Sequence, residues 1–215
     1  MMGIATKICG LSTEEAVSAA SAGGAAFLGF VFYPPSPRAI TPRRAARLCA
    51  GVPPGITRVG LFVDADDRAI DRVLAEAPVE MLQFHGGETP DRVAAAKLRF
   101  GRPVMKAVPV AGPEDVASAA RYQGVADFLL FDAKPPRRID ALPGGNGLAF
   151  DWELIAGCSW RVPWMLSGGL NAESLAEAVR ISGTAAVDVS SGVESRPGVK
   201  DVEKIRAFLA AARAL

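Results

Sequence analysis

One short apolar segment near the start of the chain carries two side chains that could move a proton. In a strand over Ile4–Cys9, alternation places Ile4 and Ile8 on one side and Lys7 and Cys9 on the other. Because a nearby ammonium group favours the thiolate form of a cysteine, Cys9 could act as a base at neutral pH. A buried and inert thiol is the alternative that these residues leave open.

The carboxyl group of Asp132 is the second candidate for proton transfer. It follows the apolar run Phe128–Phe131 and shares one strand face with Phe128 and Leu130. A carboxyl group that is sheltered from water can keep its proton and then act as a general acid. The alternatives are that Asp132 caps a turn or pairs with Lys134.

Two glycine-bearing loops, LSGGLN at 166–171 and VDVSSGVE at 187–194, predict an anion site. Each loop closes an apolar run, and a helical pattern follows the first. Glycine lets backbone N–H groups approach an anion, and a following helix N-terminus favours negative charge. Tight turns alone are the plainer interpretation, but two such loops in successive units favour a phosphate site. The expected phosphate-binding residues are Gly168, Gly169, Ser190, Ser191 and Gly192.

Four further polar side chains are candidates for contacts with a ligand. Asp188 could hydrogen-bond sugar hydroxyls or balance an inward lysine such as Lys106. Arg38 could hold a carboxylate, although an isolated loop arginine is more often a solvated surface charge. His85, the only histidine, shares a face with Gln83 and is expected either to make a polar contact to the ligand or to support a residue that does. One histidine cannot build a histidine-rich metal site, so no metal is predicted.

Eight β-prone runs alternate with helical stretches along the chain, which indicates parallel strands joined by right-handed crossovers. The runs are Ile4–Cys9, Ala26–Phe32, Arg58–Val63, Met81–Phe84, Val104–Val108, Phe128–Phe131, Trp164–Leu166 and Ala186–Val189. The helical stretches are Thr13–Ala22, Pro42–Ala50, Asp66–Ala77, Pro90–Phe100, Pro113–Tyr122, Phe150–Gly157, Ala172–Ile181 and Asp201–Ala214. Eight such units predict an α/β fold, a closed (β/α)₈ barrel. Its active site would lie at the C-terminal face of the strands, where the long loops Tyr33–Arg38 and Lys134–Gly147 also belong.

The composition fits one domain over residues 1–215, with 50% hydrophobic residues and a net charge of +1. No apolar run is long enough to span a membrane, and no basic stripe suggests nucleic acid as a partner. Three cysteines without a CxxC pair argue against disulfides and zinc, so we expect a cytoplasmic protein. Cys49 and Cys158 are expected to pack within helices. A monomer is expected, with a homodimer as the alternative.

The motifs together resemble the phosphoribosylanthranilate isomerase family of tryptophan biosynthesis. The resemblance runs in family order through KICG, GFVFYPPSPR, VGLFVD, QFHGGE, FDAKPP, GGNGLAFDW, LSGGLN and DVSSGVE, over nearly the whole chain. KICG together with SPR and SSGVE is specific to the family, whereas LSGG alone occurs in many phosphate-binding barrels. The loop reads GGNG where GGTG is expected, a change that puts little in doubt.

The resemblance implies an Amadori rearrangement of a phosphoribosyl anthranilate, without cofactor or metal. It places the general base on Cys9, the general acid on Asp132 and the anthranilate carboxylate on Arg38, with phosphate at the two glycine loops. The residues expected to contact the substrate are Lys7, Arg38, Gln83, His85 and Asp188. The alternatives are an indole-forming lyase using Lys7 or Lys106, a metal-dependent sugar-phosphate epimerase, and an inactive barrel that serves as a binding module.

Overall fold

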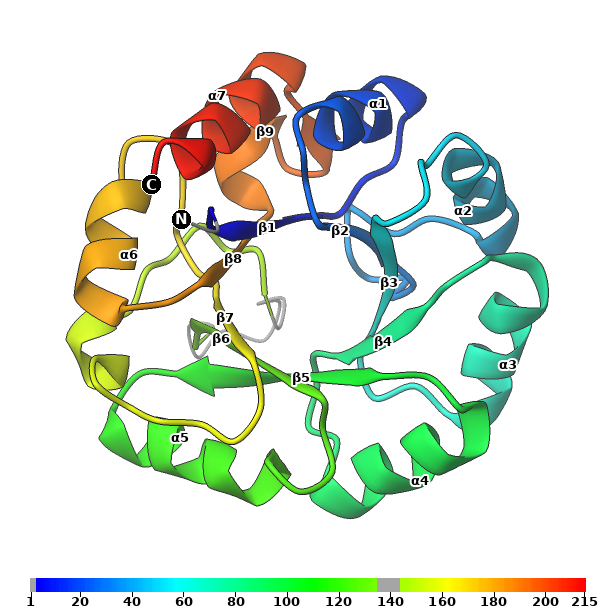
Figure 1. The fold of residues 1–215 in the computed structure, drawn as a ribbon. Helices are drawn as coiled ribbons and strands as arrows, with labels where there is room; N and C mark the ends of the chain where they lie inside the picture. Colours follow the sequence, from blue (N-terminus) through cyan, green and yellow to red (C-terminus); the bar gives the residue numbers. More distant parts are fainter. Residues whose placement is uncertain (1–2, 135–143) are drawn as a thin grey trace.

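The computed structural model describes residues 3–134 and 144–215, and these form a closed barrel of parallel strands (Figure 1). Neighbours in the barrel follow the order of the sequence, and β1 also pairs with β8 to close the ring. The strands are β1 (Ala5–Cys9), β2 (Phe27–Val31), β3 (Thr57–Phe62), β4 (Met81–Phe84), β5 (Val104–Val110), β6 (Phe128–Ala133), β7 (Trp164–Leu166) and β8 (Ala186–Val189). The predicted (β/α)₈ barrel is confirmed.

Helices surround the strands as an outer ring, as Figure 1 shows in the view along the barrel. They are α1 (Glu14–Ala22), α2 (Pro42–Cys49), α3 (Asp67–Glu76), α4 (Pro90–Phe100), α5 (Pro113–Ser118), α6 (Leu175–Ser182) and α7 (Val202–Arg213). Several begin at a capping side chain. Thr13, Thr41, Asp66 and Thr89 each accept a hydrogen bond from a backbone N–H three residues on.

The structure corrects three of the predicted helices. The stretch Pro113–Tyr122 is divided into α5 and a 3₁₀-helix, η1 (Ala119–Tyr122), and the stretch Phe150–Gly157 contains only a 3₁₀ turn, η2 (Trp152–Ile155). The last of these three corrected helices, α6, begins later than predicted. Oδ1 of Asn171 accepts hydrogen bonds from backbone N–H groups that follow it, and the chain therefore makes a turn before the helix starts.

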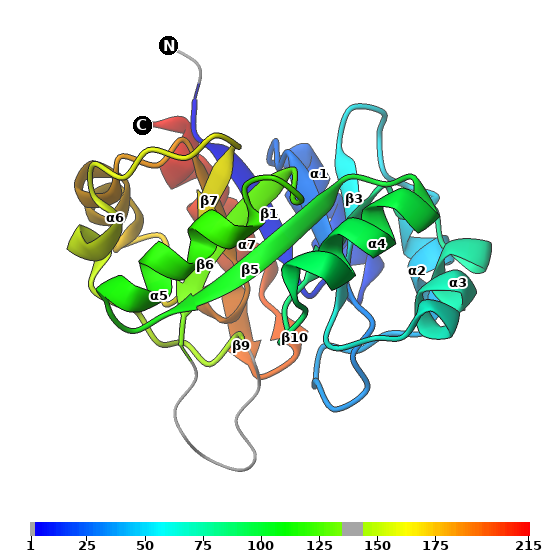
Figure 2. The same cartoon turned by 90° about the horizontal axis from the view of Figure 1, so that it is seen from below.

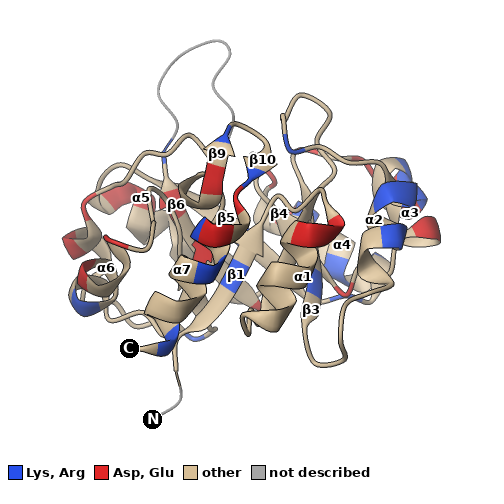
Figure 3. Ribbon diagram, turned by 90° about the horizontal axis from the view of Figure 1, so that it is seen from above, with Lys and Arg blue, Asp and Glu red and all other residues tan. Residues whose placement is uncertain are grey.

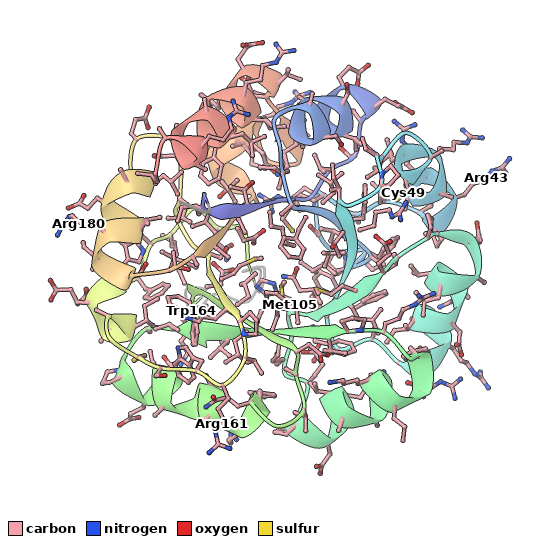
Figure 4. All side chains as sticks on the ribbon, viewed as in Figure 1. Arg43, Cys49, Met105, Arg161, Trp164 and Arg180 are labelled. Carbon is pink, nitrogen blue, oxygen red and sulfur yellow. The ribbon has the colours of Figure 1, made fainter. Side chains whose placement is uncertain are left out.

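The two remaining cysteines differ in their surroundings. Cys49 is buried at the end of α2, as expected, and Figure 4 shows it between the helix and the barrel. Cys158 is exposed and follows η2, so the expectation that it packs within a helix is wrong.

Side chains that alternate along the strands fill two separate apolar regions. Those pointing outward, such as Ile8 and Phe131, pack against the helices. Those pointing inward near the start of the strands, such as Met105 and Leu130, form a cluster inside the barrel. Figure 4 shows Met105 near the middle of the ring, whereas Arg43 and Arg180 point away from it. The far end of the interior holds polar side chains beside a small third cluster of Cys9, Val31 and Leu61.

A short hairpin that the sequence did not predict follows the last barrel strand. After β8 the chain makes a 3₁₀ turn, η3 (Ser191–Val193), and then the antiparallel pair β9 (Glu194–Arg196) and β10 (Val199–Lys200). Figure 2 shows this hairpin at the opposite end of the barrel from both chain termini. Since it follows the carboxyl end of β8, the hairpin lies on the face where the active site is expected. Within the described ranges, no helix has the length and apolarity that crossing a bilayer would require.

Candidate active site

A pocket of about 730 Å³ opens at the carboxyl ends of the strands. One part of its wall is apolar and comes from β2, β3 and the residues after them: Val31, Tyr33, Leu61 and Val63. Another part is polar and comes from the loops after β7 and β8: Gly168, Gly169, Ser190 and Ser191. In the ring, β1 lies between these two parts. The mixed lining is typical of a small-molecule site.

Cys9 ends β1 and lines the pocket between the apolar and the polar wall. Gly29 on β2 leaves space for it, since a Cβ at that position would lie 2.9 Å from Sγ of Cys9. Burial raises the pKa of the Cys9 thiol, and the charges of Lys7 and Lys200 offset this only in part. The expectation that Lys7 alone would favour the thiolate at neutral pH is therefore corrected, because desolvation has the larger effect.

Lys7 lies beneath Cys9 and is fully buried. Its Nζ donates to Oδ1 of Asp188 at 2.8 Å, and Oδ2 of Asp188 accepts from Ser167 at 3.2 Å. Burial would lower the pKa of Lys7, but Asp188 and Cys9 outweigh it and raise the pKa. One alternative had paired Asp188 with Lys106, and the structure does not show that pair. Asp188 lines the pocket, whereas Lys7 does not reach it, so the expected contact between Lys7 and a substrate is not supported.

Asp132 ends β6 and also lines the pocket, as the strand alternation predicted. Its Oδ2 lies 3.1 Å from Nε2 of His85, and its Oδ1 accepts from the backbone N–H of Ala133. Lys134 is paired instead with Asp115, at 2.8 Å, which removes the predicted alternative of an Asp132–Lys134 pair. The carboxyl group is therefore held by β4 and its own strand, and it faces the pocket.

His85 lines the pocket, but Gln83 does not. The side chain of Gln83 is fully buried, with its Nε2 3.0 Å from Nδ1 of His85. Gln83 and Lys7 both lie beneath the residues that line the pocket, and the expected contact of Gln83 with a substrate stays a prediction.

Arg38 is buried, with 5% of its surface exposed, so the alternative of a solvated surface arginine is wrong. Its Nε and Nη2 donate to the two carboxylate oxygens of Glu194 at 2.8 and 2.9 Å, and Nη2 also donates to the carbonyl of Gly145 at 3.0 Å. This bidentate pair fixes the plane of the guanidinium group at the edge of the pocket. Glu194 was quoted only as part of the SSGVE motif, and no role was predicted for it.

Lys200 is a second buried charge that sequence reasoning missed. Its Nζ donates to Oε1 of Glu194 at 2.7 Å and to the carbonyl and hydroxyl oxygens of Ser190 at 2.9 and 3.1 Å. Burial lowers the pKa of Lys200, with partial compensation by Glu194. Figure 3 shows the acidic and basic positions of β9 and β10 side by side at this face. The hairpin therefore connects Arg38 to the loop after β8.

Positive φ angles explain the glycines of the first loop. Gly168 and Gly169 have φ values of +88° and +66°, and a Cβ on either would lie 2.7 Å from a backbone nitrogen. Both line the pocket with Ser190 and Ser191, whereas Gly192 packs against the carbonyl of Leu170 and does not line it. Because α6 begins only at Leu175, the first loop is not itself a helix N-terminus.

A third buried pair supports the loops on the opposite side of the barrel. Nζ of Lys106 donates to Glu88 at 3.0 Å and to the carbonyl of Gly86 at 2.7 Å. Glu88 in turn accepts from the backbone N–H groups of Asp64 and Gly86. These bonds hold the loops after β3 and β4 together.

Among the described residues, no group of three His, Cys, Asp or Glu side chains is arranged to hold a metal ion.

The structure thus brings Cys9, Arg38, His85, Asp132 and Asp188 together around one pocket with the two glycine loops. The predicted long loop Lys134–Gly147 contributes residues 144–147, and its residues 135–143 lie outside the described part of the chain.

Comparison with known proteins gives one consistent result. The family model described as N-(5'phosphoribosyl)anthranilate (PRA) isomerase matches residues 6–211. The chain is 56% identical to the N-(5'-phosphoribosyl)anthranilate isomerase of Rhodospirillum centenum, over 100% of both chains. It is 55% identical to that of Paramagnetospirillum magneticum, over 99% and 98% of the two chains.

Solved structures agree. The phosphoribosyl anthranilate isomerase of Thermotoga maritima has a TM-score of 0.87 at 36% identity, covering 99% of this chain and 100% of that one. A phosphoribosyl anthranilate isomerase in complex with a reduced 1-(o-carboxyphenylamino)-1-deoxyribulose 5-phosphate has a TM-score of 0.82 at 34% identity, with the same coverage. The barrel, the pocket and the matching motifs carry the same conclusion: the chain belongs to the N-(5'-phosphoribosyl)anthranilate isomerase family, enzymes of tryptophan biosynthesis.

Proposed function

We propose that the pocket catalyses the Amadori rearrangement of N-(5'-phosphoribosyl)anthranilate, with Cys9 as general base and Asp132 as general acid. The observation that carries the proposal is that both groups line one pocket whose walls differ in character. The apolar residues of β2 and β3 suit an aromatic ring, and the glycine loops after β7 and β8 suit a phosphate. The ribose would then lie between them, against Cys9 and Asp132.

The reaction uses two side-chain proton transfers, followed by a tautomerisation that moves the enol proton to C1′, and it needs no cofactor. Asp132 gives its proton to the furanose ring oxygen, the bond from that oxygen to C1′ breaks, and a protonated Schiff base forms with the anthranilate nitrogen. Cys9 then removes the proton from C2′, and the electron pair moves to give an enolamine. The enolamine tautomerises to the ketone of 1-(2-carboxyphenylamino)-1-deoxyribulose 5-phosphate. General acid and base groups of this kind contribute about 10²–10⁴-fold each.

Binding residues are assigned by position. Arg38, held in its plane by Glu194, binds the anthranilate carboxylate at the apolar side of the pocket. Asp188 accepts a hydrogen bond from a ribose hydroxyl. The phosphate is held by Gly168, Gly169, Ser190 and Ser191, which line the pocket, whereas the predicted contact of Gly192 stays a prediction. The hydroxyl group of Ser190 already donates to the carbonyl of Cys9, which links the phosphate loop to the base.

We also propose that the enzyme works in the cytoplasm as a monomer on a small phosphorylated substrate. Three unpaired cysteines support the first point. A homodimer is the alternative for the second, since the relative from Thermotoga maritima is described as dimeric.

The test is turnover of the anthranilate substrate, followed by loss of its fluorescence, in purified Cys9→Ala and Asp132→Asn. Each should lose most of kcat, and neither should rescue a tryptophan auxotroph that lacks the isomerase. Cys158→Ala is the matched control, because this cysteine is exposed and does not line the pocket. Wild-type kcat in Cys9→Ala would remove the thiol from the mechanism.

A further inference from the structure

Gln83 lies fully buried in β4, and its amide group contacts the ring of His85. Its Nε2 is 3.0 Å from Nδ1 of His85. An amide nitrogen can donate a hydrogen bond but cannot accept one, so Nδ1 must be the acceptor. The proton of the neutral imidazole therefore sits on the other nitrogen, Nε2.

That second nitrogen points at the carboxyl group of Asp132. Nε2 of His85 lies 3.1 Å from Oδ2, so with this tautomer its N–H donates to that oxygen of Asp132. With the amide of Gln83 turned over, its oxygen would face Nδ1, and the ring proton would have to move there. Once Asp132 has given up its proton, the lone pair of Nε2 would then oppose Oδ2. The amide orientation that the structure shows is therefore the one that suits the carboxylate formed during the reaction.

The other end of the amide has no competing partner in the described part of the chain. Oε1 of Gln83 is buried and has no hydrogen-bond partner among the described residues. A buried carbonyl without a partner is unfavourable and is rare in folded proteins. In this part of the molecule the amide is thus oriented by its contact with His85.

We propose that Gln83 is a positioning residue for the general acid, which it serves by fixing the tautomer of His85. The proposal rests on the role given above to Asp132. When Asp132 gives up its proton, it becomes a carboxylate, and the hydrogen bond from Nε2–H strengthens as that charge develops. With the proton on Nδ1 instead, His85 would have no donor for that charge.

The surroundings of this hydrogen bond are closely packed. A Cβ on Gly144 would lie 2.6 Å from Nε2 of His85 and 2.7 Å from Oδ2 of Asp132, so the backbone covers the bond directly. The other titratable or charged groups that line the pocket are Cys9, Tyr33, Arg38 and Asp188. Behind the loop that follows His85 lie Lys106, Glu88 and Asp64.

The tautomer can be measured directly, because His85 is the only histidine in the chain. In protein labelled with ¹⁵N-histidine, a single pair of ring-nitrogen signals is observed, and the unprotonated nitrogen resonates far downfield of the protonated one. We expect Nε2–H in the wild-type enzyme at neutral to mildly alkaline pH. We expect protonated Nδ1 in Gln83→Glu, whose carboxylate accepts a hydrogen bond and has no donor. Protonated Nδ1 in the wild type, or unprotonated Nδ1 in Gln83→Glu, would overturn the proposal.

Kinetics provide the second measurement. Gln83→Leu should lower kcat about tenfold with KM within about twofold, since the lost interaction forms chiefly in the transition state. Gln83→Glu should lose more than Gln83→Leu. The matched control is Gln123→Leu, which affects the only other glutamine, one that accepts from the backbone of Arg161. Unchanged kcat in a folded Gln83→Leu would refute the positioning role, and the wild-type NMR result remains decisive if that variant fails to fold.

Failure of this inference differs from failure of the proposed mechanism. If Asp132 is not the acid, Asp132→Asn retains wild-type kcat. If Asp132 is the acid and Gln83 has no positioning role, Asp132→Asn is inactive while Gln83→Leu retains wild-type kcat.

Discussion

Replacing Glu194 by glutamine should destabilise the protein strongly, because two buried cations depend on its charge. The carboxylate accepts from Arg38 at 2.8 and 2.9 Å and from Lys200 at 2.7 Å. The side chains of Arg38 and Lys200 are only 6% and 1% exposed. Removing one partner of a buried pair costs roughly 3–5 kcal/mol, since the remaining charge stays desolvated. Glutamine keeps one acceptor, so we expect the lower end, about 3 kcal/mol.

The assay is thermal and urea unfolding of Glu194→Gln beside the wild type. For a chain of this size, 3 kcal/mol corresponds to a fall in Tm of about 6–12 °C. Glu203→Gln is the matched control, because Glu203 pairs with Arg206 at the surface, where 78% of its side chain is exposed. Exposed ion pairs contribute little, so this variant should unfold like the wild type.

The pKa of Glu194 determines how the stability difference between wild type and Glu194→Gln changes with pH. Burial would raise the pKa of Glu194, but the hydrogen bond from Arg38 and the charge of Lys200 outweigh it and hold the pKa below its ordinary value. A carboxyl group with a depressed pKa stabilises the fold above the pKa that it has in the unfolded chain. That stabilisation is lost as the pH falls through the folded-state pKa. The difference in stability between wild type and Glu194→Gln should therefore shrink in acid. A difference below about 1 kcal/mol at neutral pH, or one that does not change in acid, would refute the reasoning.

Three further predictions concern catalysis. Because burial raises the pKa of Cys9, kcat/KM should still rise with pH above neutrality, and a profile that is already flat at neutral pH would contradict this. Asp132→Asn cannot deliver a proton, so kcat and kcat/KM should fall together; wild-type kcat in this variant would assign the acid to another group. Arg38→Ala should weaken the binding of ligands that carry the anthranilate carboxylate. Gly169→Asp should weaken the binding of ligands that carry the phosphate. Titration calorimetry with ligands that lack one group or the other measures both effects, and a reversed sensitivity of the two variants would show that the two ends of the site are assigned the wrong way round.

The sequence was sufficient to predict what depends on local periodicity. The two-residue period of a strand placed Cys9 and Asp132 on inward faces, and the structure confirms both. The order of strands and helices likewise predicted the closed barrel. These features could be predicted because each depends on residues that are close together along the chain.

The pairing of buried charges could not be predicted in the same way. Asp188 was weighed against Lys106, but the register of β1 and β8 places it opposite Lys7, which is 181 residues away. Arg38 and Glu194 are 156 residues apart. Such pairs depend on how the barrel closes, and no local pattern encodes that. The glycine in the turn of the β9–β10 hairpin, Gly198 with φ +81°, was a signal that could have been used.

The salt bridge between Arg38 and Glu194 also has a consequence during biosynthesis. It joins the loop after the second strand to the hairpin after the eighth, across β1, where the ring of strands closes. A nascent chain that still lacks its last strand and hairpin has neither the partner of Arg38 nor the second glycine loop. The ribosome must therefore finish nearly the whole chain before an active site can exist. Fragments that end before β8 should be inactive at every concentration, unless the missing C-terminal segment is supplied as a separate chain.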